Sequence, residues 1–281
     1  MFSLNINGRL IEFDKPAVMG IINVTPDSFH SASRAQTARE VAEKALRMVA
    51  DGAGILDIGA CSTRPGSSAP DAAEEWERLD RALRAVRDAV GPDVPVSVDT
   101  YRADVARRAV ESGRADIIND IGGCTLDPDM EATVAALRVP YVLMHMRGTP
   151  ATMQHMCDYT DVTAGVISEL APTLDRLTLA GVADIIVDPG FGFAKTLEQN
   201  YSLLAGLPAL AEALQRPVLA GVSRKSMATR LLGITAEEAL PATSALHMAA
   251  LERGAAILRA HDVAEAVQTV KIHRQLAASQ A

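Results

Sequence analysis

Cysteine and aromatic residues are both scarce in this sequence. Its 281 residues include three cysteines, and aromatic residues make up 4% of the chain. Cys61, Cys124 and Cys157 are odd in number, lie far apart and form no CxxC pair. This pattern argues against a disulfide framework and against a cysteine-based zinc site. It favours a reducing cytoplasm as the compartment in which the protein works.

Long apolar runs and an excess of positive charge are also missing. No apolar run reaches the roughly 18 residues of a membrane-spanning helix, and residues 1–14 lack the basic region and long apolar core of a signal peptide. The net charge is −8, with no cluster of lysine and arginine. We therefore expect no binding to nucleic acid or to membranes, and an anionic ligand would have to be held by a few local cations.

Proline-rich linkers and low-complexity tracts are absent, so the sequence predicts a single domain over residues 1–281. What is present is a regular alternation of short apolar runs with segments of helical spacing. The expected strands are 18–22, 55–58, 94–98, 117–118, 141–144, 185–187, 218–222 and 256–258. The expected helices lie near 37–49, 72–90, 103–111, 130–137, 162–180, 197–214, from 226 to about 252, and 263–276.

Eight strand–helix units predict an α/β protein with a (β/α)8 TIM barrel. A doubly wound open sheet is the alternative, but no GxGxxG follows the first strand. Before the barrel, residues 2–13 alternate apolar and polar on both sides of Asn7-Gly8, which predicts an N-terminal β-hairpin. We expect this hairpin to close the bottom of the barrel.

A polar residue stands at the carboxyl end of every expected strand. In sequence order these residues are Asn23, Asp57, Asp99, Asn119, His145, Asp188, Lys225, and Arg259 with His261. An aspartate after a strand is often only the cap of the next helix, but eight polar ends together are hard to explain as caps. In a barrel these ends converge on one face, which is where active sites lie.

The stretch around Asp57 shows the plan most clearly. Asp57 interrupts the apolar strand 55–58, and a carboxylate is costly to bury there unless something pairs with it. The polar loop 62–66 follows, with hydroxyls beside an arginine. Such a loop suits a phosphate or carboxylate group, although an ordinary strand and turn is the simpler reading of this segment alone.

The converging groups indicate the kind of ligand. Acceptors and an amide from Asp99, Asn119 and Asp188 suit a flat heterocycle with several N–H donors. The expected cations, which suit a phosphate ester or diphosphate, are Lys225, Arg64, Arg259 and His261. The expected apolar walls are Phe29, Phe191, Phe193 and Met144.

A series of motifs, in order and over nearly the whole chain, resembles the dihydropteroate synthase family. The motifs are Asn23-Val-Thr-Pro-Asp-Ser-Phe29, Asp57-Ile-Gly with Ser62-Thr-Arg-Pro-Gly66, Ser97-Val-Asp-Thr-Tyr101, Ile118-Asn-Asp-Ile121, Leu143-Met-His-Met-Arg-Gly-Thr-Pro150, Asp188-Pro-Gly-Phe-Gly-Phe193, Ser223-Arg-Lys225 and Arg259-Ala-His-Asp262. The ordered series is specific, whereas one motif alone would be weak.

The resemblance implies an enzyme that joins 6-hydroxymethyl-7,8-dihydropterin diphosphate to 4-aminobenzoate in folate biosynthesis and releases diphosphate. It implies catalytic roles for Asp188, Lys225, Asp99 and Arg64. It also implies pterin binding by Asp99, Asn119, Met144, Asp188 and Lys225, and diphosphate binding by Arg259 and His261. Around 4-aminobenzoate it implies Thr63, Arg64, Pro65, Phe29, Phe193 and Ser226. Asn23 matches a position tied to Mg²⁺, the implied cofactor, and the family implies a homodimer formed through the last helices.

The sequence departs from the family pattern in two loops. Ser31 replaces an aspartate, Ala32 and Ser33 replace two glycines, and Ala60-Cys61 replaces Gly-Glu. The altered loops leave a pterin-binding paralogue with weak or no synthase activity as the alternative. A pterin-binding methyltransferase on the same barrel and a Schiff-base aldolase using Lys225 are further alternatives. For the homodimer, the residues offered as an apolar patch are Leu231, Leu232, Leu246 and Leu251.

Overall fold

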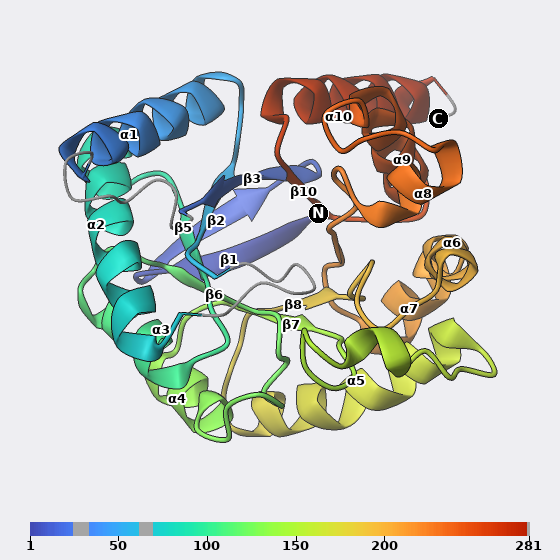
Figure 1. Cartoon of the computed structure of the whole chain (residues 1–281), viewed down its shortest axis with the longest axis horizontal. Coiled ribbons are helices and arrows are strands. Elements are labelled where there is room, and N and C mark those ends of the chain that lie inside the picture. Colours follow the sequence, from blue (N-terminus) through green and yellow to red (C-terminus); the bar gives the residue numbers. More distant parts are fainter. Residues whose placement is uncertain (25–33, 62–69, 280–281) are drawn as a thin grey trace.

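A computed structural model describes residues 1–24, 34–61 and 70–279 and shows strands alternating with helices along the chain (Figure 1). The first two strands, β1 (Phe2–Ile6) and β2 (Arg9–Phe13), form a separate antiparallel hairpin. Eight parallel strands follow within the described ranges: β3 (Ala17–Asn23), β4 (Ile55–Gly59), β5 (Val96–Asp99), β6 (Ile117–Asp120), β7 (Tyr141–Met144), β8 (Ile185–Asp188), β9 (Leu219–Ala220) and β10 (Ile257–Ala260).

The helices lie around the outside of these strands (Figure 1). They are α1 (Arg34–Ala50), α2 (Ala72–Val90), α3 (Ala103–Glu111), α4 (Met130–Leu137), α5 (Val162–Leu179), α6 (Leu197–Ala205), α7 (Leu207–Leu214), α8 (Ser226–Leu232), α9 (Leu240–Leu251) and α10 (Val263–Ala278), with a short 3₁₀ turn, η2 (Met153–His155), before α5. Among these described helices, none is long and apolar enough to cross a membrane.

The strands close into a barrel. Their order is β8-β7-β6-β5-β4-β3-β10-β9. The two ends of this order meet where Val187 forms a parallel bridge with Val218 and donates its N–H to the carbonyl of Pro217 at 2.9 Å. The (β/α)8 barrel expected from the sequence is therefore confirmed, and the open-sheet alternative is wrong.

Two expected helices are each broken in two. The segment 197–214 contains α6 and α7, because Gly206 ends the first and Pro208, which lacks an N–H, fits the first turn of the second. After residue 225 the chain forms α8 and α9. Gly233 ends α8 with a φ of 66°, in the left-handed region that glycine adopts readily.

The hairpin covers the amino-terminal end of the barrel, as expected. Leu4 and Ile6 are each 1% exposed and pack among the apolar side chains at the beginnings of the strands, such as Met19 and Ile55. Polar contacts fix the same position: the backbone N–H of Asn5 donates to Asp184 Oδ2 at 2.8 Å. The hairpin seals one end of the barrel, so the opposite end is left for chemistry.

Candidate active site

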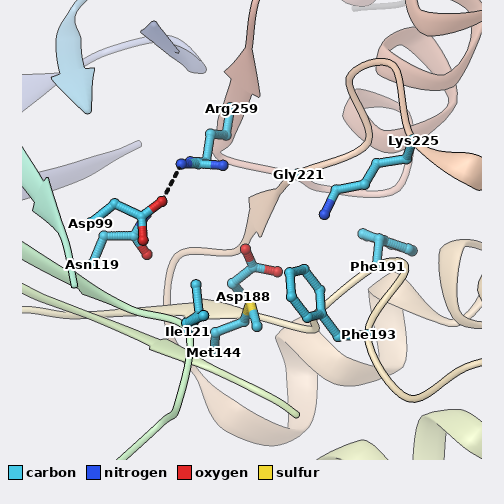
Figure 2. Close-up of a pocket in the computed structure, with 10 residues that line it drawn as sticks. All are labelled: Asp99, Asn119, Ile121, Met144, Asp188, Phe191, Phe193, Gly221, Lys225 and Arg259. Carbon is cyan, nitrogen blue, oxygen red and sulfur yellow. Dashed lines mark hydrogen bonds and ion pairs between the residues drawn. The ribbon is translucent and has the colours of Figure 1, made fainter. Parts of the chain in front are cut away.

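The carboxyl ends of the strands surround a cavity, which Figure 2 shows in close-up. Side chains alternate along a strand, so residues two apart point into the barrel at successive levels. The cavity is lined by Asp99, Asn119, Ile121, Met144, Asp188, Phe191, Phe193, Gly221, Lys225 and Arg259. Its space amounts to about 410 Å³, including the part open to solvent.

Arg259 lies at the centre of a charged cluster at one side of the cavity. Its Nη2 donates to Asp99 Oδ2 at 2.6 Å, and its Nε donates to Asp57 Oδ2 at 2.7 Å. Asn119 Nδ2 donates to the same Asp57 oxygen at 3.0 Å. Asp57 is fully buried, so the pairing that its sequence context requires is provided by Arg259 and Asn119.

The two aspartates compete for one guanidinium. Burial, and beyond it the charges of Asp57 and Glu75, raise the pKa of Asp99 to about 7 against the pull of Arg259. The carboxylates of Asp57 and Asp99 hold the pKa of Arg259 above its ordinary value despite burial. Arg259 therefore stays positively charged, and in the ligand-free protein its charge is paired with these two carboxylates.

Asp188 and Lys225 lie on the other side of the cavity (Figure 2). Asp188 Oδ1 accepts a hydrogen bond from Gly190 N at 2.7 Å. Burial raises the pKa of Asp188, while this hydrogen bond and the Lys225 charge oppose that rise. The ammonium of Lys225 lies 4.3 Å from the centre of the Phe193 ring, and burial lowers its pKa to about 8.

The loop that follows β8 shapes this side of the site. Gly190 has a φ of 72°, and a Cβ there would stand 2.0 Å from the carbonyl oxygen of His145. No other residue type fits that approach, which explains the glycine in the Asp188–Phe193 motif. The loop thereby brings Phe191 and Phe193 to the cavity, where both are at least nine-tenths buried.

His145 does not join the cavity, although it stands at a strand end like the other polar residues. Met144 points inward, and strand alternation turns His145 outward, where it is 3% exposed. Its Nδ1 lies 3.0 Å from Lys195 Nζ, and its Nε2 lies 3.1 Å from Glu169 Oε2. Lys195 and Glu169 were not singled out by sequence reasoning; the signal for Lys195 was its place two residues after the Phe193 motif.

Other expected site residues lie near the cavity without lining it. Ser226 is the first residue of α8, directly after Lys225. Asn23 ends β3 and is exposed. His261 Nδ1 lies 3.0 Å from Ser223 Oγ, and burial together with the Arg259 charge lowers the His261 pKa to about 4. His261 therefore offers an uncharged ring in the ligand-free protein near neutral pH, and its expected role at a phosphate stays a prediction.

Several expected residues belong to loops outside the described ranges. They are Phe29, Thr63, Arg64 and Pro65, together with the altered positions Ser31, Ala32 and Ser33.

Cys61, by contrast, is described and sits beside a buried carboxylate. Arg102 forms an ion pair with the fully buried Glu75 and also donates to Cys61 Sγ at 3.6 Å. Thr100 Oγ1 donates to Glu75 at 2.6 Å. Burial and the Glu75 charge raise the pKa of the Cys61 thiol to about 12, so it stays protonated and uncharged.

Residues 1–24, 34–61 and 70–279 contain no group of three or more His, Cys, Asp or Glu side chains arranged to hold a metal ion. The exposed amide oxygen of Asn23 is a hard ligand of the kind that Mg²⁺ accepts, and Mg²⁺ commonly keeps water and substrate phosphates as its other ligands. Asn23 can therefore supply one oxygen ligand to such an ion.

A barrel with a polar cavity at the carboxyl ends of its strands defines this chain as a barrel enzyme, and comparison with known proteins gives the family. Residues 19–261 match the family described as "Pterin binding enzyme". A dihydropteroate synthase of Synechocystis is 42% identical over 258 residues, covering 91% of this chain and 88% of the relative.

Solved structures agree. A Xanthomonas albilineans dihydropteroate synthase with 4-aminobenzoic acid has 39% identity and a TM-score of 0.88, covering 98% of both chains. A structure of the enzyme from the same organism in complex with 7,8-dihydropteroate has 37% identity and a TM-score of 0.85, covering 98% of this chain and 99% of the other. The chain belongs to the family of pterin binding enzymes. Its place within that family is among the dihydropteroate synthases.

Proposed function

We propose that this protein is a transferase that joins 6-hydroxymethyl-7,8-dihydropterin diphosphate to 4-aminobenzoate, giving 7,8-dihydropteroate and diphosphate. One observation carries the proposal. One cavity brings Asp99, Asn119 and Arg259 on one side together with Asp188 and Lys225 on the other. Family membership agrees with it, since the relatives carry the same activity in their names.

The pterin ring fits between the polar groups of the cavity. The N–H groups on its edge would donate to Asp99 and Asp188, while Asn119 can both donate and accept. Lys225, which lies over Phe193, would donate to a ring acceptor. Met144 and Phe193 line the cavity and offer apolar contact to the ring faces.

The reaction is a displacement at the methylene carbon of the pterin. The amine nitrogen of 4-aminobenzoate forms the new C–N bond, the C–O bond to diphosphate breaks with its electron pair leaving on oxygen, and the amine loses a proton. The methylene carbon becomes electron-poor as the C–O bond lengthens, and the carboxylate of Asp188 would stabilise that charge. Arg259 and His261 are assigned to the departing diphosphate.

Two further assignments complete the proposed site. Mg²⁺ at Asn23 would neutralise charge on the diphosphate when bound. The 4-aminobenzoate site is assigned to Phe193 and Ser226 together with Phe29, Thr63, Arg64 and Pro65, the last four being outside the described residues. We assign the catalytic roles to Asp99, Asp188, Lys225 and Arg64.

The proposal is tested by measuring diphosphate release and dihydropteroate formation with both substrates and Mg²⁺. We expect release that depends on 4-aminobenzoate and is matched by product. Slow release without dihydropteroate would contradict the proposal and favour the pterin-binding paralogue. The uncharged thiol of Cys61 beside Glu75 is the observation that favours this alternative. The relatives reported above are named dihydropteroate synthases, and none of these names indicates a methyltransferase or an aldolase.

The pH dependence of kcat/KM for the pterin diphosphate follows from the two charged sides of the cavity. Asp99 must be ionised to accept from the pterin, and its pKa is about 7. Lys225 must be protonated to donate, and its pKa is about 8. We therefore expect a bell-shaped profile that falls below pH 7 and above pH 8. In Lys225→Arg the alkaline limb should move to higher pH, and a flat wild-type profile from pH 6 to pH 9 would contradict this assignment.

The raised pKa of Asp99 also makes the stability of the folded protein depend on pH. The pKa of Asp99 in the folded protein exceeds its ordinary value of 3.8, so the folded state binds more protons than the unfolded state between these values. The contribution of Asp99 to stability therefore falls as the pH rises from about 4 to about 7.

We also propose that the protein is a homodimer formed through its last helices. Leu231 and Leu232 on α8 are 57% and 55% exposed, but Leu246 and Leu251 are buried in the protein's own core, so their expected place in the apolar patch is wrong. Ile272 on α10 is 56% exposed and adds to the apolar surface of these helices. Light scattering after gel filtration would test the proposal, and a monomer mass would contradict it.

Two broader proposals remain. Residues 1–281 would act as a single pterin-binding domain, and the protein would work in the cytoplasm, where its three free cysteines would stay reduced.

A further inference from the structure

A buried ammonium supports the loop that follows β8. Lys195 is 3% exposed, and its Nζ has three polar neighbours. It donates to the carbonyl oxygens of Gly190 at 3.0 Å and of Phe193 at 2.9 Å, and it lies 3.0 Å from His145 Nδ1. None of these three groups is a carboxylate. Lys195 therefore serves its neighbours by donating hydrogen bonds rather than by pairing with an adjacent charge.

Counting donors fixes the state of the neighbouring histidine. A protonated lysine has three N–H bonds, and two of them go to carbonyl oxygens that can only accept. While Lys195 is protonated, its third N–H faces His145 Nδ1 as an acceptor, so the His145 proton is on Nε2 and points to Glu169 at 3.1 Å. Burial lowers the pKa of Lys195 to about 7. An uncharged Lys195 would still donate to both carbonyl oxygens and would accept from His145 Nδ1. Burial and the Lys195 charge lower the pKa of His145 to about 4, which agrees with a neutral ring.

The two carbonyls that Lys195 holds belong to the peptides that form the pterin side of the cavity. The N–H of Gly190 donates to Asp188 Oδ1 at 2.7 Å, and the Phe193 ring lies under the Lys225 ammonium. The outer part of the same loop has a separate anchor, because Gly192 N donates to Asn200 Oδ1 at 2.6 Å. Lys195 thus contacts the part of the loop that bears on Asp188 and Lys225.

We propose that Lys195, backed by His145 and Glu169, is a positioning residue that sets Asp188 and Phe193 for pterin binding. It touches neither the cavity nor a substrate and acts through the backbone of Gly190 and Phe193. The inference rests on the proposed function for the identity of the ligand. It adds that pterin affinity depends on a series of contacts that runs from the loop after β8 through Lys195 and His145 to Glu169.

The test replaces Lys195 by methionine, which has similar length and no donor. We expect the Kd for the pterin diphosphate, measured by calorimetry without 4-aminobenzoate, to rise about tenfold or more. The melting temperature should change little, because relief from burying an ammonium offsets the loss of its hydrogen bonds to two carbonyl oxygens. Lys195→Arg, which keeps several donors, should recover at least part of the affinity. Lys15→Met, an exposed lysine beside the hairpin, is the matched control and should bind as the wild type does.

A second variant guards against failure of the first to fold. Glu169 is partly exposed at the outer end of the chain, and Glu169→Gln removes the anionic acceptor for His145. We expect a weaker shift in the same direction, about threefold in Kd.

The outcomes separate this inference from the proposed function. Wild-type protein that does not bind the pterin diphosphate would contradict the proposed function. Wild-type binding together with unchanged affinity in both variants, or a lower melting temperature with unchanged affinity, would overturn the positioning role alone.

Discussion

Arg259→Met is expected to destabilise the fold by about 3–5 kcal/mol, because it leaves buried carboxylates without their cation. Asp57 is fully buried and accepts from Arg259 at 2.7 Å, and Asp99 is held by the same guanidinium. Urea denaturation monitored by circular dichroism measures the loss. The loss should be larger at pH 8 than at pH 5, because Asp99, whose pKa is raised to about 7 mainly by burial, is largely neutral at the lower pH.

A double variant separates lost pairing from lost packing. Arg259→Met combined with Asp57→Asn removes the buried charge as well as its partner, and it should recover a large part of the stability. Arg224→Met is the matched control, because Arg224 pairs with Asp262 where both side chains are partly exposed, and it should cost about 1 kcal/mol. Equal losses of unfolding free energy in the Arg259 and Arg224 variants would contradict the expectation that burial makes the Arg259 cluster more costly to break.

Asp188→Asn is expected to lower kcat/KM for the pterin diphosphate by about a hundredfold or more, with little change in stability. The amide oxygen can keep the hydrogen bond from Gly190 N, which Asp188 Oδ1 now accepts at 2.7 Å. The amide NH₂ then faces the cavity, where it meets Lys225 and the N–H edge of the substrate. Two donors face each other, and the negative charge that would stabilise the reacting carbon is gone.

The matched control for this variant lies at the other end of the same strand. Asp184 directly precedes β8 and accepts from the backbone of Asn5 in the hairpin. Asp184→Asn should leave steady-state kinetics unchanged, because the amino-terminal end of a barrel serves stability rather than chemistry. Asp188→Asn with near wild-type kcat/KM would remove Asp188 from the site.

The fold was largely predictable because each strand is an apolar run bounded by polar residues. Strand β7 (Tyr141–Met144) and helix α2 (Ala72–Val90) have the bounds that the sequence predicts. The breaks at Gly206 and Gly233 were missed, because helical spacing continues across both and single glycines are tolerated within helices.

The sequence predicted which residues point into the cavity, but it did not show that strand alternation turns one strand-end residue away from it. Asp99, Asn119, Asp188, Lys225 and Arg259 line it as expected. His145 does not, because it is one residue beyond the inward Met144 and therefore points to the opposite face.

Contacts between residues far apart in the sequence could not be predicted from it. The pairing of Arg259 with Asp57 joins positions at opposite ends of the chain, and the contact of Lys195 with His145 joins two different strand–helix units. Only the closed barrel brings them together. Local patterns identify the polar residues at strand ends, but they do not show which of them form hydrogen bonds or ion pairs with one another.

The position of the hairpin also determines how the protein would be oriented when it is attached to a solid support. Met1 is fully exposed and directly precedes β1, a strand of the hairpin that covers the amino-terminal end of the barrel. A tether or affinity tag joined there would anchor the molecule by its sealed end, with the substrate entrance directed away from the support. Immobilised enzyme attached in this orientation should keep free access for both substrates.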